Sequence, residues 1–217
     1  MTVVAFQTAD QVRQAIPAVD AHLQSGGLLA YPTETVYGLG SRPNDADVAA
    51  LFALKGRARD KPFLLLVADR SMVEACGLRF TEAARALADA FWPGPLTLVL
   101  PGGEGRLPDA LRGPGGGIAV RWTSHPAVAR LIDALGYPLT STSANRTGGS
   151  TAPGVAAIAA DFQEAIAGGR LLVLDGGMLG NVPPSTVVDC TEARPRLLRE
   201  GAISGAKLRR LAGSAAP

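Results

Sequence analysis

Four cationic side chains and one acid stand within the seven-residue segment 55–61, Lys-Gly-Arg-Ala-Arg-Asp-Lys. An arginine guanidinium offers phosphate oxygens a fixed fork of donors, and a lysine ammonium is a compact point charge that reaches a crowded oxygen. The segment therefore favours an exposed polyphosphate site. A solvated basic turn is the alternative, because cations are stabilised at helix C-termini. The chain has 18 Arg but three Lys, two of them here (Lys55 and Lys61), which favours the polyphosphate site.

A second polar segment, 139–151 (LTSTSANRTGGST), runs from apolar residues into hydroxyl, amide and glycine residues. Such residues at the end of a buried strand expose backbone N–H groups and hydroxyl donors, which suits an anionic or zwitterionic ligand. Ser143 and Asn145 point to one face if the strand conformation continues that far. An ordinary Ser/Thr-rich loop explains the same composition.

Two further segments combine strand-like apolar residues with polar ones. In 31–40 (YPTETVYGLG), Thr33 and Glu34 suit an amine or hydroxyl ligand, and a sheet edge with a bend explains the segment equally well. In 184–189 (PSTVVD), Ser185 precedes a short apolar run, and Arg199 follows ten residues after its end. By itself this pattern indicates two strands joined by a turn. None of the four segments identifies a function alone.

An alternation of helices and strands must position these segments. Helix-period apolar residues and capping residues predict helices that start at Thr8 or Asp10, at Asn44 or Asp45 and at Thr81, and helices over 126–135, 155–166 and near Lys207. Short apolar runs predict strands over 28–31, 63–67, 96–100, 118–121, 139–142, 171–174, 187–188 and 196–198. Pro17 argues against an unbroken first helix. The alternation predicts an α/β (α+β) fold with helices packed on a sheet.

Composition limits the class of protein. With 217 residues, 47% hydrophobic and 18% charged, the chain can bury a sizeable core, and a wholly disordered protein is excluded. We expect one domain over 1–212 and a frayed tail over 213–217. The net charge of +2 is too weak to indicate nucleic-acid binding by itself.

Several kinds of site lack the residues they need. His22 is expected on a helix surface and His125 at a helix start, so histidine-rich metal sites are not supported. No Lys follows a Gly, which excludes a P-loop. Cys76 and Cys190 are expected to be buried, reduced thiols. No apolar run approaches the ~18–20 residues of a membrane span, so we expect a cytoplasmic protein without membrane contact.

Seven ordered blocks resemble the YrdC-type L-threonylcarbamoyladenylate synthases. They are YPTETVYGLG (31–40), LKGR (54–57) continuing to DKPFLLLV, FWPGPLTLVL (91–100), GIAVRWTSHP (117–126), TSTSANRTGGS (140–150), PSTVVDC (184–190) and LLREGAIS (197–204). The resemblance implies a single domain whose twisted mixed sheet and flanking helices surround a large electropositive cleft. It also implies synthesis of L-threonylcarbamoyl-AMP and pyrophosphate from L-threonine, bicarbonate or CO₂, and ATP, for threonylcarbamoylation of the tRNA adenosine next to the anticodon.

The resemblance assigns the nucleotide site residue by residue. Lys55 and Arg57 match the family's KxR motif, which implies that both are catalytic and bind ATP. Asn145 matches the last position of the SxN motif and is implied to bind the nucleotide. Two further residues complete the implied ATP-binding set. Lys61 is implied to lie near phosphate, and Arg199 stands before the GAIS block with one residue between them.

The implied L-threonine site consists of Thr33, Arg121, Ser143 and Ser185, each of which matches a motif position. Leu66 is a departure, because some members carry a histidine there that contacts the threonine carboxylate. That contact must be absent or replaced in this chain.

Partners and alternatives follow from the same resemblance. Mg²⁺ is expected mainly on the ATP phosphates, with no protein metal site, since no paired carboxylates offer one. A downstream tRNA threonylcarbamoyl-transferase complex is expected to use the product, and tRNA or double-stranded RNA is a further candidate contact. One alternative is an RNA-binding protein without chemistry of its own. Another is the carbamoyl-adenylating domain of hydrogenase maturation factors, whose zinc-finger and acylphosphatase segments this sequence lacks.

Overall fold

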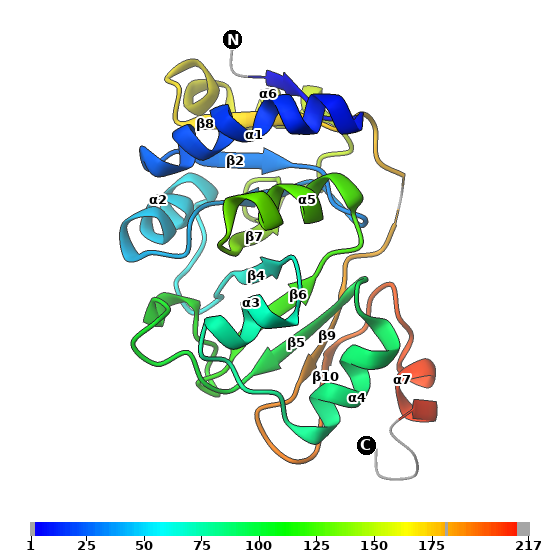
Figure 1. The fold of residues 1–217 in the computed structure, drawn as a ribbon. Helices are drawn as coiled ribbons and strands as arrows, with labels where there is room; N and C mark the ends of the chain where they lie inside the picture. Colours follow the sequence, from blue (N-terminus) through cyan, green and yellow to red (C-terminus); the bar gives the residue numbers. More distant parts are fainter. Residues whose placement is uncertain (1–2, 181, 212–217) are drawn as a thin grey trace.

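The computed structural model describes residues 3–180 and 182–211, and in this part of the chain ten strands form one mixed sheet (Figure 1). The strands are β1 (Val3–Ala5), β2 (Leu28–Tyr31), β3 (Gly38–Gly40), β4 (Leu64–Val67), β5 (Leu96–Leu100), β6 (Ile118–Trp122), β7 (Leu139–Ser143), β8 (Leu171–Asp175), β9 (Thr186–Asp189) and β10 (Arg196–Arg199). Their order is β1-β8-β2-β3-β7-β4-β6-β5-β9-β10. The predicted sheet with flanking helices is confirmed.

Helices flank this sheet along its length (Figure 1). They are α1 (Ala9–Gln24), α2 (Asp45–Lys55), α3 (Arg70–Ala75), α4 (Glu82–Phe91), α5 (Pro126–Leu135), α6 (Val155–Ala167) and α7 (Gly205–Leu211), with a 3₁₀ turn at Asp109–Leu111. The starts of the first helices follow the predicted caps. Thr8 forms a capping box with Gln11, and Asn44 and Thr81 accept backbone N–H groups of α2 and α4. Pro17 lies inside α1 without ending it, so the expectation that it interrupts the first helix is wrong.

Two apolar clusters lie on opposite faces of the sheet, as the alternation of side chains along a strand requires. In β2, Leu28 and Ala30 belong to one cluster and Leu29 and Tyr31 to the other. Residues of α2 and α6 pack into the first cluster, and residues of α1 and α5 into the second. Leu66 is completely buried in the second cluster. The core therefore holds each strand in a fixed register.

Four short elements were not predicted, namely β1, β3, α3 and the 3₁₀ turn. Their lengths of three to six residues are too short to show a period. β3 corrects one interpretation of segment 31–40, because it lies between β2 and β7 inside the sheet and not at an edge. The expected tail, 213–217, lies outside the described residues.

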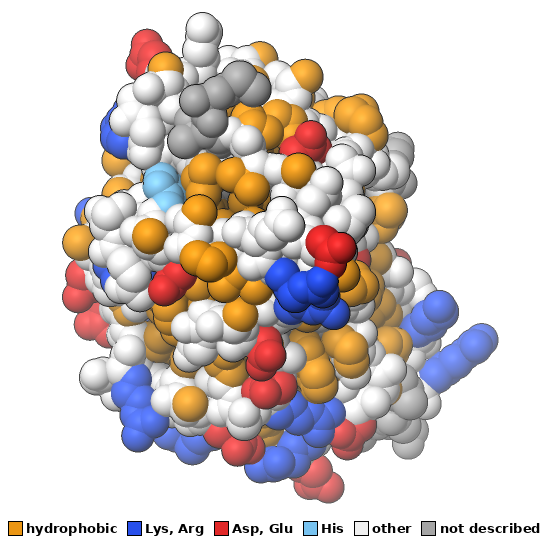
Figure 2. Space-filling model, turned by 45° about the horizontal axis from the view of Figure 1, so that its top comes forward, with side chains coloured by type: hydrophobic (Ala, Val, Ile, Leu, Met, Phe, Trp, Pro, Cys, Tyr) orange, Lys and Arg blue, Asp and Glu red, His pale blue; other side chains and the backbone are white. Residues whose placement is uncertain are grey.

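Surface charges of both signs are interspersed on the face that Figure 2 presents. Basic side chains gather toward its lower edge, where acidic ones interrupt them.

Candidate functional site

A cleft of about 530 Å³ opens where segments 31–40, 139–151 and 184–199 meet. These distant segments come together because β3 pairs with β7, β7 with β4, and β5 with β9. The predicted site residues that line the cleft are Thr33, Arg57, Arg121, Ser143, Ser185 and Arg199. Lys55, Lys61 and Asn145 lie outside the lining.

Arg57 is half-buried and held from two sides. Its Nε donates to the Lys61 carbonyl oxygen at 2.6 Å, and its Nη1 donates to Thr142 Oγ1 at 3.3 Å. The guanidinium carbon lies 5.6 Å from the centre of the Phe63 ring. Its Nη2 has no hydrogen-bond partner among residues 3–180 and 182–211, and it is therefore available to a ligand. Burial lowers the pKa of this group.

Lys55 is only 3% exposed, so the expectation of an exposed cluster is wrong at this position. Its ammonium donates toward the carbonyl and hydroxyl oxygens of Ser143 and toward the carbonyl and side-chain oxygens of Asn145. Burial, followed by the charge of Arg57, lowers the pKa of Lys55 to about 8, so the group is mainly protonated at neutral pH. The Lys55 ammonium is therefore hydrogen-bonded to oxygen atoms of the protein.

The SxN residues have separate places. Ser143 ends β7 and lines the cleft, whereas Asn145 follows the strand and is 6% exposed. They do not share a strand face, because β7 ends between them, and they meet through the Lys55 ammonium instead. The Asn145 side-chain amide donates to the carbonyl oxygens of Arg146 at 2.9 Å and Gly149 at 2.6 Å. These bonds close the loop 145–149.

Thr33 forms a tight turn at the start of the 31–40 segment. Its hydroxyl donates to the Val36 carbonyl oxygen at 2.6 Å and accepts the N–H groups of Thr35 and Val36 at 3.2 Å each. The side chain is 3% exposed. The turn brings Glu34 and Thr35 beside Arg121, which comes from β6.

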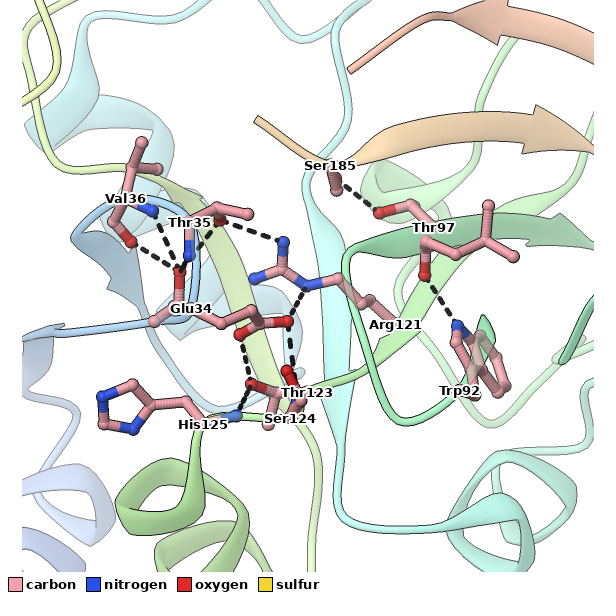
Figure 3. A network of polar contacts seen from close by, with 12 residues as sticks. Glu34, Thr35, Val36, Trp92, Thr97, Arg121, Thr123, Ser124, His125 and Ser185 are labelled. Atoms are coloured by element: carbon pink, nitrogen blue, oxygen red, sulfur yellow. Dashed lines mark hydrogen bonds and ion pairs between the residues drawn. The ribbon is translucent and has the colours of Figure 1, made fainter. Parts of the chain in front are cut away.

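Glu34, which the family motif left without an assigned role, fixes a buried guanidinium next to the cleft (Figure 3). Its Oε1 lies 3.7 Å from Arg121 Nε, and its Oε2 accepts the Thr123 hydroxyl at 2.6 Å. Arg121 Nη1 donates to Thr35 Oγ1 at 3.3 Å. Arg121 Nε has no hydrogen-bond partner within the described part of the chain. Burial lowers the pKa of Arg121, and the Glu34 charge opposes that shift.

Glu34→Gln is expected to destabilise the protein by about 1–3 kcal/mol. The neutral amide keeps an oxygen for Thr123 but leaves a buried guanidinium without its counter-charge. Thermal unfolding measures this effect. Glu104→Gln is the matched control, because the Glu104 side chain is 69% exposed and ion pairs of an exposed carboxylate are worth at most about 1 kcal/mol. Equal melting temperatures for the two variants contradict the prediction.

Ser185 and Arg199 also line the cleft and are bonded to each other. Ser185 Oγ lies 2.8 Å from Thr97 Oγ1 (Figure 3). Arg199 Nε and Nη2 both donate to the Ser185 carbonyl oxygen, at 3.1 and 2.8 Å. Burial lowers the pKa of Arg199, and the charges of Arg121 and Arg57 add to that effect. The charges of the two other arginines that line the cleft therefore reach Arg199.

The charge of the lining favours an anion with several negative charges. Three arginines line the cleft, and none of its lining residues in the described part of the chain is acidic. No group of three His, Cys, Asp or Glu residues that suits a metal ion occurs among the described residues.

Hydroxyl-bearing residues that sequence reasoning missed also line the cleft: Thr35, Thr97, Ser141, Thr142 and Thr151. Ser141 could have been found, because it alternates with Ser143 along a strand and therefore shares its face. Thr97 lies within an apolar run and carries no such signal.

The remaining predictions concern residues outside the cleft. His22 lies on α1 as predicted and is partly buried, with Nε2 2.9 Å from the Leu28 carbonyl oxygen. His125 caps α5 as predicted. Cys76 and Cys190 are free and buried, also as predicted. Within the described ranges, no helix has the length and apolar character needed to cross a membrane.

Comparisons with known proteins identify the family of this chain. A family model named Sua5/YciO/YrdC, described as telomere recombination, matches residues 21–201. The threonylcarbamoyl-AMP synthase of Chromohalobacter salexigens is 42% identical over 84% of this chain and 94% of its own length. That of Bacillus subtilis is 35% identical over 89% of this chain, but the chain spans only 55% of it.

Solved structures give the same relationship. The structure of P. abyssi Sua5 complexed with L-threonine is 32% identical and superposes with a TM-score of 0.87 over all of this chain and 62% of that one. E. coli YciO is 26% identical, with a TM-score of 0.78 over 93% of this chain and 95% of its own. The matched family model and these relatives show that the chain belongs to the Sua5/YciO/YrdC family.

Proposed function

We propose that this protein makes L-threonylcarbamoyl-AMP and pyrophosphate from L-threonine, bicarbonate or CO₂, and ATP. The observation that carries the proposal is the cleft in which three guanidiniums and a set of hydroxyls meet, because it suits a polyphosphate beside a small zwitterion. The relatives named threonylcarbamoyl-AMP synthase, and the Sua5 structure complexed with L-threonine, support it. The chain is thus an enzyme of the nucleotidyltransferase class.

The nucleotide occupies the side of the cleft formed by Arg57 and Arg199. Arg57 offers its free Nη2 to phosphate, and exposed Lys61 adds a mobile charge four residues away. Asn145 takes part through the loop 145–149, which its amide closes. Lys55 supports the same side of the cleft.

L-Threonine occupies the side formed by Arg121, Thr33, Ser143 and Ser185. The buried Arg121 guanidinium pairs with the amino-acid carboxylate, since an arginine fork matches a carboxylate in shape. Hydroxyl groups of the lining hold the amine and the side chain. Leu66 is buried behind this side, in register with Arg121 on the neighbouring strand, while Leu64 lines the cleft. Because Leu66 supplies no polar contact, Arg121 is the charged partner that remains for the threonine carboxylate on this side.

The reaction needs charge compensation more than acid–base catalysis. The threonine amine adds to CO₂ and loses a proton, which gives a carbamate. A carbamate oxygen then attacks the α-phosphorus in line, the bond to the bridging oxygen breaks, and pyrophosphate leaves with that electron pair. Carbamate and triphosphate together accumulate negative charge, which fixed guanidiniums offset. Mg²⁺ enters with the substrate as MgATP, held by phosphate oxygens and water.

The product serves threonylcarbamoylation of the tRNA adenosine next to the anticodon, through a downstream transferase complex. We place the enzyme in the cytoplasm, where free thiols such as buried Cys76 and Cys190 stay reduced.

Pyrophosphate release from ATP, Mg²⁺ and bicarbonate tests the proposed function, with L-threonine compared with L-serine and with no amino acid. We expect release that depends on L-threonine, together with a product whose mass equals threonylcarbamoyl-AMP. A folded protein that releases no pyrophosphate under any of these conditions contradicts the proposal. RNA binding by that same protein then favours the alternative without chemistry.

Arg199→Ala is expected to raise the KM for ATP by about 10-fold or more, because it removes a charged donor from the cleft wall. Steady-state pyrophosphate release at varied ATP checks this. Arg196→Ala is the matched control on the same strand, since Arg196 is exposed, pairs with Asp189 and lies outside the lining. An equal rise in the KM for ATP in both variants would contradict the prediction, because Arg199 would then contribute only its charge and no contact with ATP.

A further inference from the structure

Lys55 is a buried cation that the proposed reaction leaves without a substrate contact. It is 3% exposed and lies outside the cleft lining, whereas Arg57 lines the cleft and Lys61 is exposed. A buried ammonium is tolerated only where other groups replace its water of hydration. The atoms around Lys55 Nζ therefore define what this residue does.

The hydrogen-bond partners of the ammonium all belong to the segment at the end of β7. Nζ lies 3.2 Å from Ser143 Oγ, 2.7 Å from the Asn145 carbonyl oxygen and 2.9 Å from Asn145 Oδ1, and it also contacts the Ser143 carbonyl oxygen. An ammonium has three N–H donors. Four oxygens already share them, so no donor remains for a phosphate oxygen while these contacts persist.

The backbone of Lys55 binds the same segment. Its carbonyl oxygen accepts the Thr147 backbone N–H at 3.3 Å and the Thr147 hydroxyl at 3.1 Å. Lys55 is the last residue of α2, where carbonyl groups lack partners within the helix. Ser143, Asn145 and Thr147, three alternate residues of one segment, thus all bind to a single lysine.

This arrangement connects two parts of the cleft wall. Gly56 ends α2 in the left-handed conformation, with φ of 62°, and Arg57 follows directly with its Nη1 on Thr142. Ser143, held by Lys55, also lines the cleft. The position of Lys55 therefore sets Arg57 and Ser143 relative to each other.

We infer that Lys55 is a positioning residue, which fixes the 143–149 segment against the end of α2, and that Arg57 and Lys61 supply the phosphate contacts of the basic cluster. The catalytic consequence rests on the proposed function. The structural part does not, because the contacts are made without ligand.

Lys55→Met tests the inference, since methionine keeps an unbranched side chain and removes all three donors. Hydrogen exchange of the amides of Asn145, Thr147 and Gly149, measured without ligand, is expected to accelerate by about 10-fold or more. The KM for ATP is expected to rise. Adding Asn145→Ala to Lys55→Met is expected to change that KM by less than about 2-fold, because both substitutions release the same segment.

Lys61→Met is the matched control, because it removes the same charge from an exposed position of the same cluster. It is expected to raise the KM for ATP and to leave exchange in the 143–149 segment unchanged. Its effect is expected to multiply with that of Asn145→Ala, as for independent sites.

Unchanged exchange in Lys55→Met together with a raised KM for ATP overturns the inference, because the lysine then acts on the nucleotide directly. Should Lys55→Met fail to fold, Lys55→Arg takes its place, because arginine retains the charge and the donors. Any loss of ATP affinity in Lys55→Arg must then be accompanied by faster hydrogen exchange in the 143–149 segment. Lost affinity with full protection overturns the inference equally. A wild-type protein that releases no pyrophosphate contradicts the proposed function and leaves the exchange result valid.

Discussion

Arg57→Ala is expected to lower threonine-dependent pyrophosphate release by about 100-fold or more. Arg57 lines the cleft, and its Nη2 donates to no residue in the described part of the chain. The substitution therefore removes a positive charge that stabilises the reacting phosphate. The fold should persist, since the lost contacts are one side-chain bond to the Lys61 carbonyl, one to Thr142 and the stacking on Phe63. Steady-state kinetics and thermal unfolding measure the two effects separately.

Arg59→Ala is the control within the same cluster. Arg59 is exposed and lies outside the cleft lining, with its guanidinium 6.0 Å from the Phe52 ring centre. Its substitution is expected to change turnover by less than about 2-fold, as for an exposed side chain away from the site. If Arg57→Ala keeps normal turnover and normal melting, the basic cluster does not bind the reacting phosphates.

Gly40→Ala is expected to lower the free energy of unfolding by about 3 kcal/mol, which corresponds to a melting temperature lower by roughly 10 °C. A Cβ at this position would lie 2.2 Å from the Thr140 carbonyl oxygen and 2.9 Å from the Tyr31 ring. Neither neighbour has room to move, because Tyr31 is fully buried and Thr140 belongs to the adjacent strand β7. Differential scanning calorimetry measures the change.

Gly115→Ala is the matched control. A Cβ on Gly115 would meet no atom within 4 Å, and Gly115 does not adopt positive φ. Its melting temperature should stay within about 2 °C of the wild type, as for a surface change of less than about 0.5 kcal/mol. A small effect at Gly40 would show that β3 and β7 can separate there without loss of stability.

The long elements of this fold were predictable, and the reason is physical. A helix such as α5, with a cap and an apolar stripe, and a strand such as β8, with a continuous apolar run, each carry their signal locally. β3 carries none, since its Gly-Leu-Gly sequence is set by close approach to β7. β1 has three residues and is positioned by parallel pairing with β8. Such elements depend on partners remote in sequence.

The candidate site shows the same limit. Motifs identified Arg57, Arg121, Ser185 and Arg199, which line one cleft. They could not tell that Lys55 is buried, because its burial follows from how the 143–149 segment folds over the end of α2. The same fold explains why Asn145 lies outside the lining, although Ser143 of the same motif lines the cleft.

The strand order has a consequence for how the protein is made. β1 and β2 are each hydrogen-bonded to β8, as in the pairs Val3 with Val173 and Leu28 with Leu171, and not to each other. During translation these two early strands have no partner on that side until residues 171–175 leave the ribosome. Such remote pairing slows folding and exposes unpaired strand edges in the meantime. The nascent chain therefore completes its sheet late in its own synthesis, and β2 keeps an unpaired edge until β8 has been made.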